Sequence, residues 1–237
     1  MILIPVKNLS SAKQRLASVL DQPSRTALAQ AMLYDVLSTL GNWKDRPLVA
    51  VVTGDAYALR LATDYQFEVI PDPDNPGETG AIEMATRISV ERGAASTLVI
   101  PADIPLIQAW ELEEILKHAP AEGSVLAPAA DGRGTNAAFR RPADLFPLRF
   151  GNDSFKPHHA AAQATGRACV ILNLPGIAFD VDHPEQLQQL ISLPGETRAQ
   201  RLAREYAAAA AQGVADGAET SGVGTGDPPV PPRSGSC

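Results

Sequence analysis

Short apolar runs alternate along the chain with longer segments in which apolar residues recur every three or four positions. Ile2–Val6 and Pro47–Thr53 are almost wholly aliphatic, which is typical of strands buried on both faces. Gln22–Leu40 has helical periodicity, because its apolar residues Leu28, Met32, Val36 and Leu40 are four apart. By the same criteria we expect strands at Glu68–Ile70, Thr97–Pro101, Ser124–Pro128, Asn136–Arg140 and Ala168–Leu172, and helices at Ala56–Tyr65, Thr79–Arg92, Trp110–His118, Asp153–Thr165, Pro184–Ile191 and Arg198–Gln212.

This alternation of strands and helices predicts an α/β fold, in which a largely parallel sheet is covered by helices on both faces. In open sheets of this type, ligands bind beyond the carboxyl ends of the strands. We therefore expect the functional residues just after Val6, Thr53, Pro101 and Phe139.

The composition changes once, near the carboxyl terminus. The last 25 residues, Gly213–Cys237, contain six Gly, four Pro and no aromatic residue. Such a segment buries too little apolar surface to offset its ordering entropy. We therefore expect one folded domain over residues 1–212 and a disordered Gly/Pro-rich tail over residues 213–237.

Composition and charge narrow the classes of function. No segment has the roughly 20 uninterrupted apolar residues of a membrane helix, and no basic stretch precedes the first apolar run, as it would in a signal peptide. Two cysteines, Cys169 and Cys237, are too few for a disulfide framework and fit a cytoplasmic protein. The formal charge of −7 argues against nucleic acid as the main partner, but a nucleotide needs only a local basic patch.

Three cations, Lys7, Lys13 and Arg15, follow the first strand in a loop rich in small polar residues. Backbone N–H groups and hydroxyls in such a loop can bind phosphate oxygens, while the cations neutralise their charge. The loop lacks the glycines of a P-loop or of a dinucleotide-binding motif. A solvated basic turn is the alternative interpretation.

Acidic residues follow two later segments. Asp103 lies between Pro101 and Pro105, in a rigid turn with few backbone donors, which suits a ligand of Mg²⁺. Asp180 and Asp182 are two residues apart, so in an extended segment they project to one side and need a cation between them. The alternative for Asp103 and for Asp182 is capping of the helix that follows.

A third group of candidates begins at Gly134, where the backbone can approach a ligand closely. Further along, Gly151 precedes Asn152, Asp153 and Ser154, which are typical N-cap residues and could open an anion site at a helix N-terminus. An ordinary capped helix is the alternative. His158 and His159 have no histidine partner four residues away, so we expect them on the surface or behind the ligand-binding residues rather than on zinc.

Taken together, these motifs resemble those of the 2-phospholactate, phosphoenolpyruvate and 3-phosphoglycerate guanylyltransferase family, which acts in coenzyme F420 biosynthesis. The resemblance covers about residues 1 to 192 and rests on Pro5-Val6-Lys7, Lys13-Gln14-Arg15-Leu16, Pro101-Ala102-Asp103-Ile104-Pro105, Gly134-Thr135-Asn136, Phe150-Gly151-Asn152-Asp153-Ser154-Phe155 and Phe179-Asp180-Val181-Asp182. The stretch Gly151–Phe155 is the most specific of these.

The resemblance implies a nucleotide-diphospho-sugar-transferase-like (GT-A type, Rossmann-like) fold, with a mixed, mostly parallel sheet. It also implies GTP as co-substrate and Mg²⁺ as metal. The implied roles are acid binding by Thr135, Gly151 and Ser154, Mg²⁺ binding by Asp103 with Asp180 or Asp182, and triphosphate contacts by Lys7, Lys13 and Arg15. The chain departs from the family at Glu78–Ile82, where similar enzymes usually show a Leu-Asn-Ala-Ala-like helix start.

The implied reaction joins the phosphate of the acid to the α-phosphorus of GTP and expels pyrophosphate. A phosphate is already largely ionised at neutral pH, so the reaction needs charge neutralisation and positioning more than a strong base. The product would pass to the next biosynthetic enzyme, and a homodimer is an open alternative to a single chain. Competing interpretations are a molybdenum-cofactor or sugar-nucleotide transferase, which the glycine-free loop Lys7–Lys13 disfavours, and a non-catalytic nucleotide-binding protein.

Overall fold

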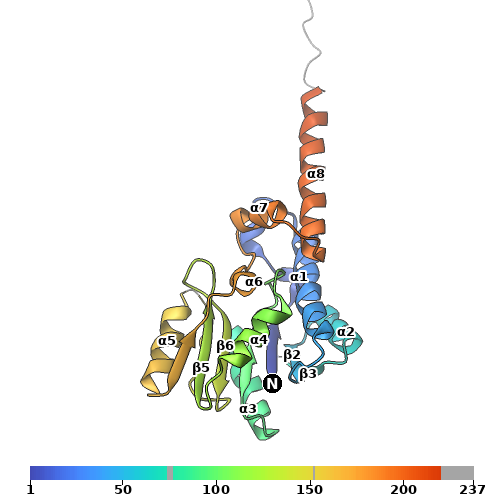
Figure 1. Ribbon diagram of the computed structural model, residues 1–237. Coiled ribbons are helices and arrows are strands. Elements are labelled where there is room, and N and C mark those ends of the chain that lie inside the picture. The colour runs from blue at the N-terminus through green and yellow to red at the C-terminus, as the bar shows by residue number, and fades with distance from the viewer. Residues whose placement is uncertain (74–76, 152, 220–237) are drawn as a thin grey trace, which may run out of the picture. The chain divides into compact units, whose positions relative to one another are not determined.

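A computed structural model of the protein describes residues 1–73, 77–151 and 153–219. Within these residues, seven strands form one sheet in the order β3-β2-β1-β4-β6-β5-β7 (Figure 1). The strands are β1 (Ile2–Val6), β2 (Val49–Thr53), β3 (Glu68–Pro71), β4 (Thr97–Val99), β5 (Gly123–Pro128), β6 (Thr135–Arg141) and β7 (Ala168–Ile171). Only β6 among them runs antiparallel to its neighbours, so the expected mixed, mostly parallel sheet is confirmed.

The reversed direction of β6 changes where its functional end lies. Because β6 is antiparallel to β4 and β5, its first residues lie at the edge where the other strands end. The expected position of functional residues just after Phe139 is therefore wrong. Thr135 and Asn136, at the start of β6, lie at that edge instead.

Helices cover both faces of the sheet, as the alternation predicts. They are α1 (Gln22–Asn42), α2 (Ala56–Asp64), α3 (Glu78–Glu91), α4 (Ala109–Lys117), α5 (Phe155–Ala164), α6 (Pro175–Ala178), α7 (Pro184–Ser192) and α8 (Arg198–Glu219), with short 3₁₀ turns η1 (Leu9–Ser11) and η2 (Gln14–Leu16). Ile2 and Ile4 of β1 pack with residues of α1 and α4, whereas Leu3 packs with α3 and α5 on the other face. Alternate side chains of one strand thus serve two cores.

The chain divides into two compact units, Met1–Ala203 and Arg204–Cys237. Helix α8 begins in the first unit, where both carboxylate oxygens of Asp35 accept from the backbone N–H groups of Arg198 and Ala199 at 2.8 Å. The helix continues to Glu219, beyond the expected end at Gln212. Its alanine run propagates helix strongly enough to pass Gly213, which costs only about 1 kcal/mol. Residues 220–237 lie outside the described part, so the disorder expected there remains a prediction.

No helix in the described part of the chain is long and apolar enough to cross a membrane.

Glu111 connects α4 to α6, which leads into the segment that carries Asp180 and Asp182. Its side chain is fully buried and its Oε1 accepts from the N–H groups of Gly176 at 2.7 Å and Ile177 at 3.3 Å. Its Oε2 accepts from the N–H of Gln108 at 2.9 Å, which caps α4. A Cβ at position 176 would clash with Glu111, so the close approach requires glycine there.

We expect Glu111→Ala to lower the free energy of unfolding by about 3 kcal/mol, because two buried N–H donors and one partly buried N–H donor lose their acceptor. The corresponding fall in melting temperature is roughly 6–12 °C, measured by thermal denaturation. Glu113→Ala, at an exposed position of the same helix, is the matched control and should change little. Equal stability of the two variants would contradict this role of Glu111.

Candidate functional site

Two adjoining cavities open at the carboxyl edge of the sheet, with volumes of about 410 and 290 Å³. Their common lining consists of Lys13, Glu78, Pro101, Asp103 and Asp182. The larger cavity is also lined by residues from the β6 start and the loop before α5, namely Thr135, Asn136, Gly151 and Ser154, together with Arg15 and Asp180. The smaller cavity extends along the loop after β1, with Lys7 in its wall.

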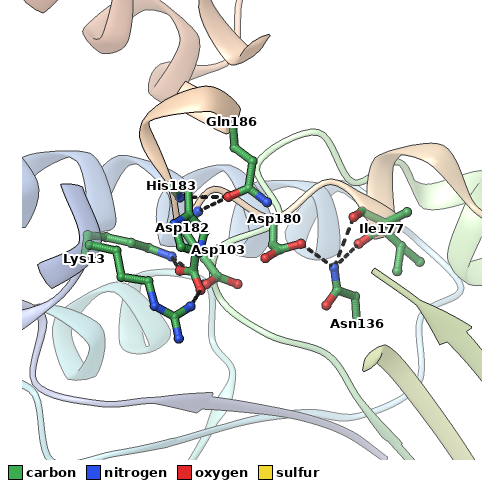
Figure 2. Close-up of polar contacts among 10 residues, drawn as sticks. Lys13, Asp103, Asn136, Ile177, Asp180, Asp182, His183 and Gln186 are labelled. Carbon is green, nitrogen blue, oxygen red and sulfur yellow. Dashed lines mark hydrogen bonds and ion pairs between the residues drawn. The ribbon is translucent and has the colours of Figure 1, made fainter. Parts of the chain in front are cut away.

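Lys13 lies at the junction of the two cavities and joins three segments of the chain. Its ammonium nitrogen lies 2.6 Å from Oδ2 of Asp103 and 2.8 Å from Oδ1 of Asp182 (Figure 2). Arg15 Nη1 contacts the other oxygen of Asp182 at 3.0 Å. The backbone of Lys13 has a φ of 56°, which is uncommon for a residue with a side chain and occurs often at functional sites.

Charge and burial together set the ionisation of this cluster. The side chain of Lys13 is 7% exposed. Burial alone would lower the pKa of Lys13, but Asp103 and Asp182 outweigh it and raise that pKa well above its ordinary value. Burial likewise opposes ionisation of Asp182, yet Lys13 and Arg15 bring its pKa below the ordinary value. Lys13 and Asp182 are therefore both charged at neutral pH.

The capping roles considered for Asp103 and Asp182 are wrong. Helix α4 begins at Ala109 with Gln108 as its N-cap, and α7 begins after His183. Tertiary contact with Lys13 replaces the local hydrogen bond in both cases. Gln186 Oε1 instead accepts from the backbone N–H groups of Asp182 and His183, each at 2.8 Å, and fixes this turn (Figure 2).

Asp180 lies next to this cluster and is held from the β6 side. Nδ2 of Asn136 donates to Oδ1 of Asp180 at 3.1 Å and to the carbonyl of Ile177 at 3.0 Å (Figure 2). Burial, reinforced by the charge of Asp103, raises the pKa of Asp180. Asn136 therefore anchors the acidic segment to the sheet, a role that the sequence did not indicate.

The residues at the centre fit a hard cation. Asp103 and Asp182 converge on one point, where the ammonium of Lys13 now lies. Mg²⁺ is commonly bound by one or two carboxylates plus substrate phosphates, so this pair is a suitable donor set. No cluster of three or more His, Cys, Asp or Glu side chains close enough to hold a metal occurs among the residues that the structure describes.

Thr135, Gly151 and Ser154 lie together on the wall of the larger cavity. The Ser154 hydroxyl accepts from the N–H of Thr135 at 3.1 Å and does not cap α5, although Ser154 is at the N-cap position. The N–H of Phe155 donates to the carbonyl of Arg133 at 2.8 Å, so this first helical amide is already satisfied within the protein. Gly151 has a φ of +141° and open space where a Cβ would be, so its backbone is accessible to a ligand. Asn152 lies outside the described residues.

Two further residues shape this wall and were not among the predicted site residues. Thr79 Oγ1 accepts from the N–H of Phe150 at 3.0 Å and donates to its carbonyl at 3.3 Å, which ties α3 to the loop before Gly151. His158 is 1% exposed, and its Nδ1 lies 2.9 Å from the Thr135 hydroxyl. The sequence does contain an indication of this position for His158. It lies four residues after Ser154, and residues four apart share one face of a helix.

Residues 1–210 match the protein family described as guanylyl transferase CofC-like. The chain belongs to this family. It is 35% identical to the phosphoenolpyruvate guanylyltransferase of Roseiflexus castenholzii over 204 residues, which are 86% of this chain and 93% of the relative. It is also 33% identical to the 3-phospho-D-glycerate guanylyltransferase of Colwellia psychrerythraea, over 81% of this chain and 91% of the relative. The expected family and enzyme class, a nucleotidyltransferase, are thereby confirmed.

The fold agrees with that of solved structures. A protein from Desulfovibrio desulfuricans G20 described as a nucleotide-diphospho-sugar transferase superimposes with a TM-score of 0.72, over 89% of this chain and 96% of the other. The sequences are 20% identical, so the likeness concerns the fold alone. The expected nucleotide-diphospho-sugar-transferase-like architecture of this CofC-like protein is confirmed.

Glu78 is the acidic member of the segment that departs from the usual family pattern. It is the first residue of α3 and lines both cavities. Burial raises the pKa of Glu78 to about 7, with a further contribution from Asp103, while Lys7 opposes the shift. Its carboxyl group is therefore partly protonated near neutral pH.

We expect Glu78→Gln to stabilise the protein at pH 8 and to make little difference at pH 4. Between the ordinary pKa of 4.5 and about 7, the folded state retains a proton that the unfolded state loses, so wild-type stability falls as pH rises. The amide removes this loss, which is on the order of 1–3 kcal/mol. Thermal denaturation of both proteins across this pH range measures the effect, and parallel pH profiles would contradict it.

Proposed function

We propose that this protein transfers the guanylyl group of GTP to the phosphate of a phosphorylated three-carbon acid. A phosphate oxygen of the acid forms a bond to the α-phosphorus of GTP, the bond from that phosphorus to the bridging oxygen breaks, and pyrophosphate leaves. The observation that carries the proposal is the charged centre, in which Lys13 bridges Asp103 and Asp182 where two cavities meet. Membership of a guanylyl transferase family supports the choice of nucleotide.

The residues that line the two cavities support a separate binding position for each substrate. We assign the acid to the larger cavity, where Thr135, Gly151 and Ser154 offer a hydroxyl-lined wall and an exposed backbone. We assign the triphosphate to the loop after β1, with Lys7 beside the smaller cavity and Arg15 beside the larger one. Lys13, between the two cavities, then lies where both phosphate groups must meet, and its fixed charge offsets their repulsion.

Mg²⁺ fits this site, with Asp103 and Asp182 as its carboxylate ligands and Asp180 close by. When bound, the ion would neutralise phosphate charge and stabilise the pyrophosphate leaving group. In its presence the ammonium of Lys13 would be free to contact phosphate oxygens, which is the role expected of this residue from the sequence.

The acid is proposed as a class with three members: phosphoenolpyruvate, 2-phospho-L-lactate and 3-phospho-D-glycerate. The two relatives compared above differ by only two percentage points in identity to this chain, yet they are named for different acids. Overall similarity therefore does not select the acid. Discrimination between such small differences depends on pocket shape and is worth about 1–3 kcal/mol per group.

The proposal extends to the biological setting. The guanylylated acid would be an intermediate of coenzyme F420 biosynthesis, handed to the next enzyme in the cytoplasm. Its diphosphate diester linkage retains the energy needed for a following transfer step, which is the reason for expecting a transient protein partner.

Pyrophosphate release tests the function directly. Purified protein, GTP and Mg²⁺ are incubated with each of the three acids, and then with all three in competition. We expect release with at least one acid and none with GTP alone. If no acid elicits release although calorimetry shows GTP binding, the proposed transfer is wrong.

We expect Asp103→Asn to lower the turnover number at least 100-fold, because the amide cannot supply the charge that a bound Mg²⁺ requires. The fold should survive, since the amide oxygen still accepts from Lys13. Asp64→Asn, at an exposed position near the end of α2, is the matched control. A Mn²⁺ titration of both variants by calorimetry should show weaker binding only for Asp103→Asn, and near wild-type turnover would remove Asp103 from the metal site.

A further inference from the structure

A chain of hydrogen bonds leads from the backbone of Arg149 through His158 to the wall of the larger cavity. The N–H of Arg149 lies 2.7 Å from Nε2 of His158. The opposite ring nitrogen, Nδ1, lies 2.9 Å from the hydroxyl oxygen of Thr135. The imidazole thus connects a loop backbone to a residue that lines the proposed acid site.

The direction of each hydrogen bond follows from the groups involved. A backbone N–H can only donate, so Nε2 of His158 is the acceptor and carries no hydrogen. In the neutral ring the hydrogen is then on Nδ1, which donates to Thr135 Oγ1. His158 remains neutral at physiological pH, because burial and the nearby charge of Arg140 lower its pKa to about 4.

The orientation of the Thr135 hydroxyl is determined in turn. Its oxygen accepts from His158 and also from the Ser154 hydroxyl, at 3.3 Å. With two donors on its lone pairs, the hydroxyl must direct its own hydrogen elsewhere, and Thr135 borders the cavity. The ring that enforces this is held in place, since it packs edge-on against Phe150 with centroids 5.0 Å apart.

We propose that His158 is a positioning residue that makes the Thr135 hydroxyl a hydrogen-bond donor to an oxygen of the phosphorylated acid. The inference rests on the proposed function for the nature of the acid. His158 itself does not touch the acid and exchanges no proton during the reaction. Its contribution is to orient Thr135 for binding of the acid, so the Michaelis constant for the acid should respond and that for GTP should not.

Two substitutions separate positioning from a purely structural role. In His158→Asn, the side-chain amide nitrogen can occupy the place of Nδ1 and donate to Thr135, but the side chain is too short to accept from Arg149. In His158→Gln, the longer amide can accept from the N–H of Arg149 but cannot also donate to Thr135. The first variant preserves the link to the substrate, and the second preserves the link to the loop.

We expect His158→Gln to raise the Michaelis constant for the acid about 10- to 100-fold, the effect of losing one hydrogen bond to a charged group. His158→Asn should stay within about threefold of wild type for the acid, and both should leave the constant for GTP within twofold. Thr135→Val should raise the Michaelis constant for the acid as much as His158→Gln does. The double variant should have no higher constant than Thr135→Val alone, because both changes remove the same hydrogen bond to the acid. His159→Gln, next in the helix, is the matched control.

The opposite ranking would overturn the inference. His158 serves only the structure of the loop if His158→Asn raises the Michaelis constant for the acid as much as His158→Gln does. The same conclusion follows if the Michaelis constants for the acid and for GTP rise together. Thermal protection by each acid in the absence of GTP gives a second readout that needs no turnover. If wild-type protein binds the acids but releases no pyrophosphate, the proposed transfer fails, whereas the ranking of the variants in acid binding still tests His158.

Discussion

The contact of Lys13 with Asp103 and Asp182 is the interaction on which the site depends. These residues are 90 and 169 positions apart in sequence, and the ammonium draws together the loop after β1, the turn after β4 and the segment before α7. Taking such charges out of water is costly, so a buried ion pair contributes little net stability. Two carboxylates aimed at one point are more readily explained by the need to bind cations than by the need to fold.

The reversed strand β6 is the second constraint, because it determines what faces those carboxylates. A parallel strand in this place would bring its carboxyl end to the site. Instead the start of β6 is there, and it contributes Asn136, which holds Asp180, and Thr135, which borders the larger cavity. Glu111 completes the arrangement from the other side by fixing α6, and the acidic segment follows directly from that helix. Hydroxyl groups and carboxylates thus meet across a cavity of about 410 Å³.

The sequence predicted the elements better than the interactions between them. Aliphatic runs identify β1 and β2 because burial on both faces leaves Thr53 as the one polar residue in these two strands. Such runs do not encode strand direction, so β6 was placed the wrong way round. Local patterns also favoured caps at Asp103 and Asp182, where contact with Lys13 prevails. The resemblance to a known family singled out Thr135, whereas Ser154 was also indicated by its residue type at a helix N-terminus. A long-range pair such as Lys13 with Asp182 leaves no pattern in the local sequence. Ser154 and His158, by contrast, are four residues apart in one helix, so their spacing indicates that they share a face.

Lys13 alone does not balance the negative charge at the junction of the two cavities. Asp103, Asp182 and a partly ionised Glu78 together carry more negative charge than Lys13 can offset, and a triphosphate adds to the excess. Lys7 and Arg15 lie on the walls of the two cavities, where they can meet phosphate oxygens that the acidic centre repels. Protonation of Glu78, whose pKa is about 7, removes part of this repulsion. A mildly acidic protein can therefore present a site suited to phosphate groups, because Lys7, Lys13 and Arg15 line the two cavities.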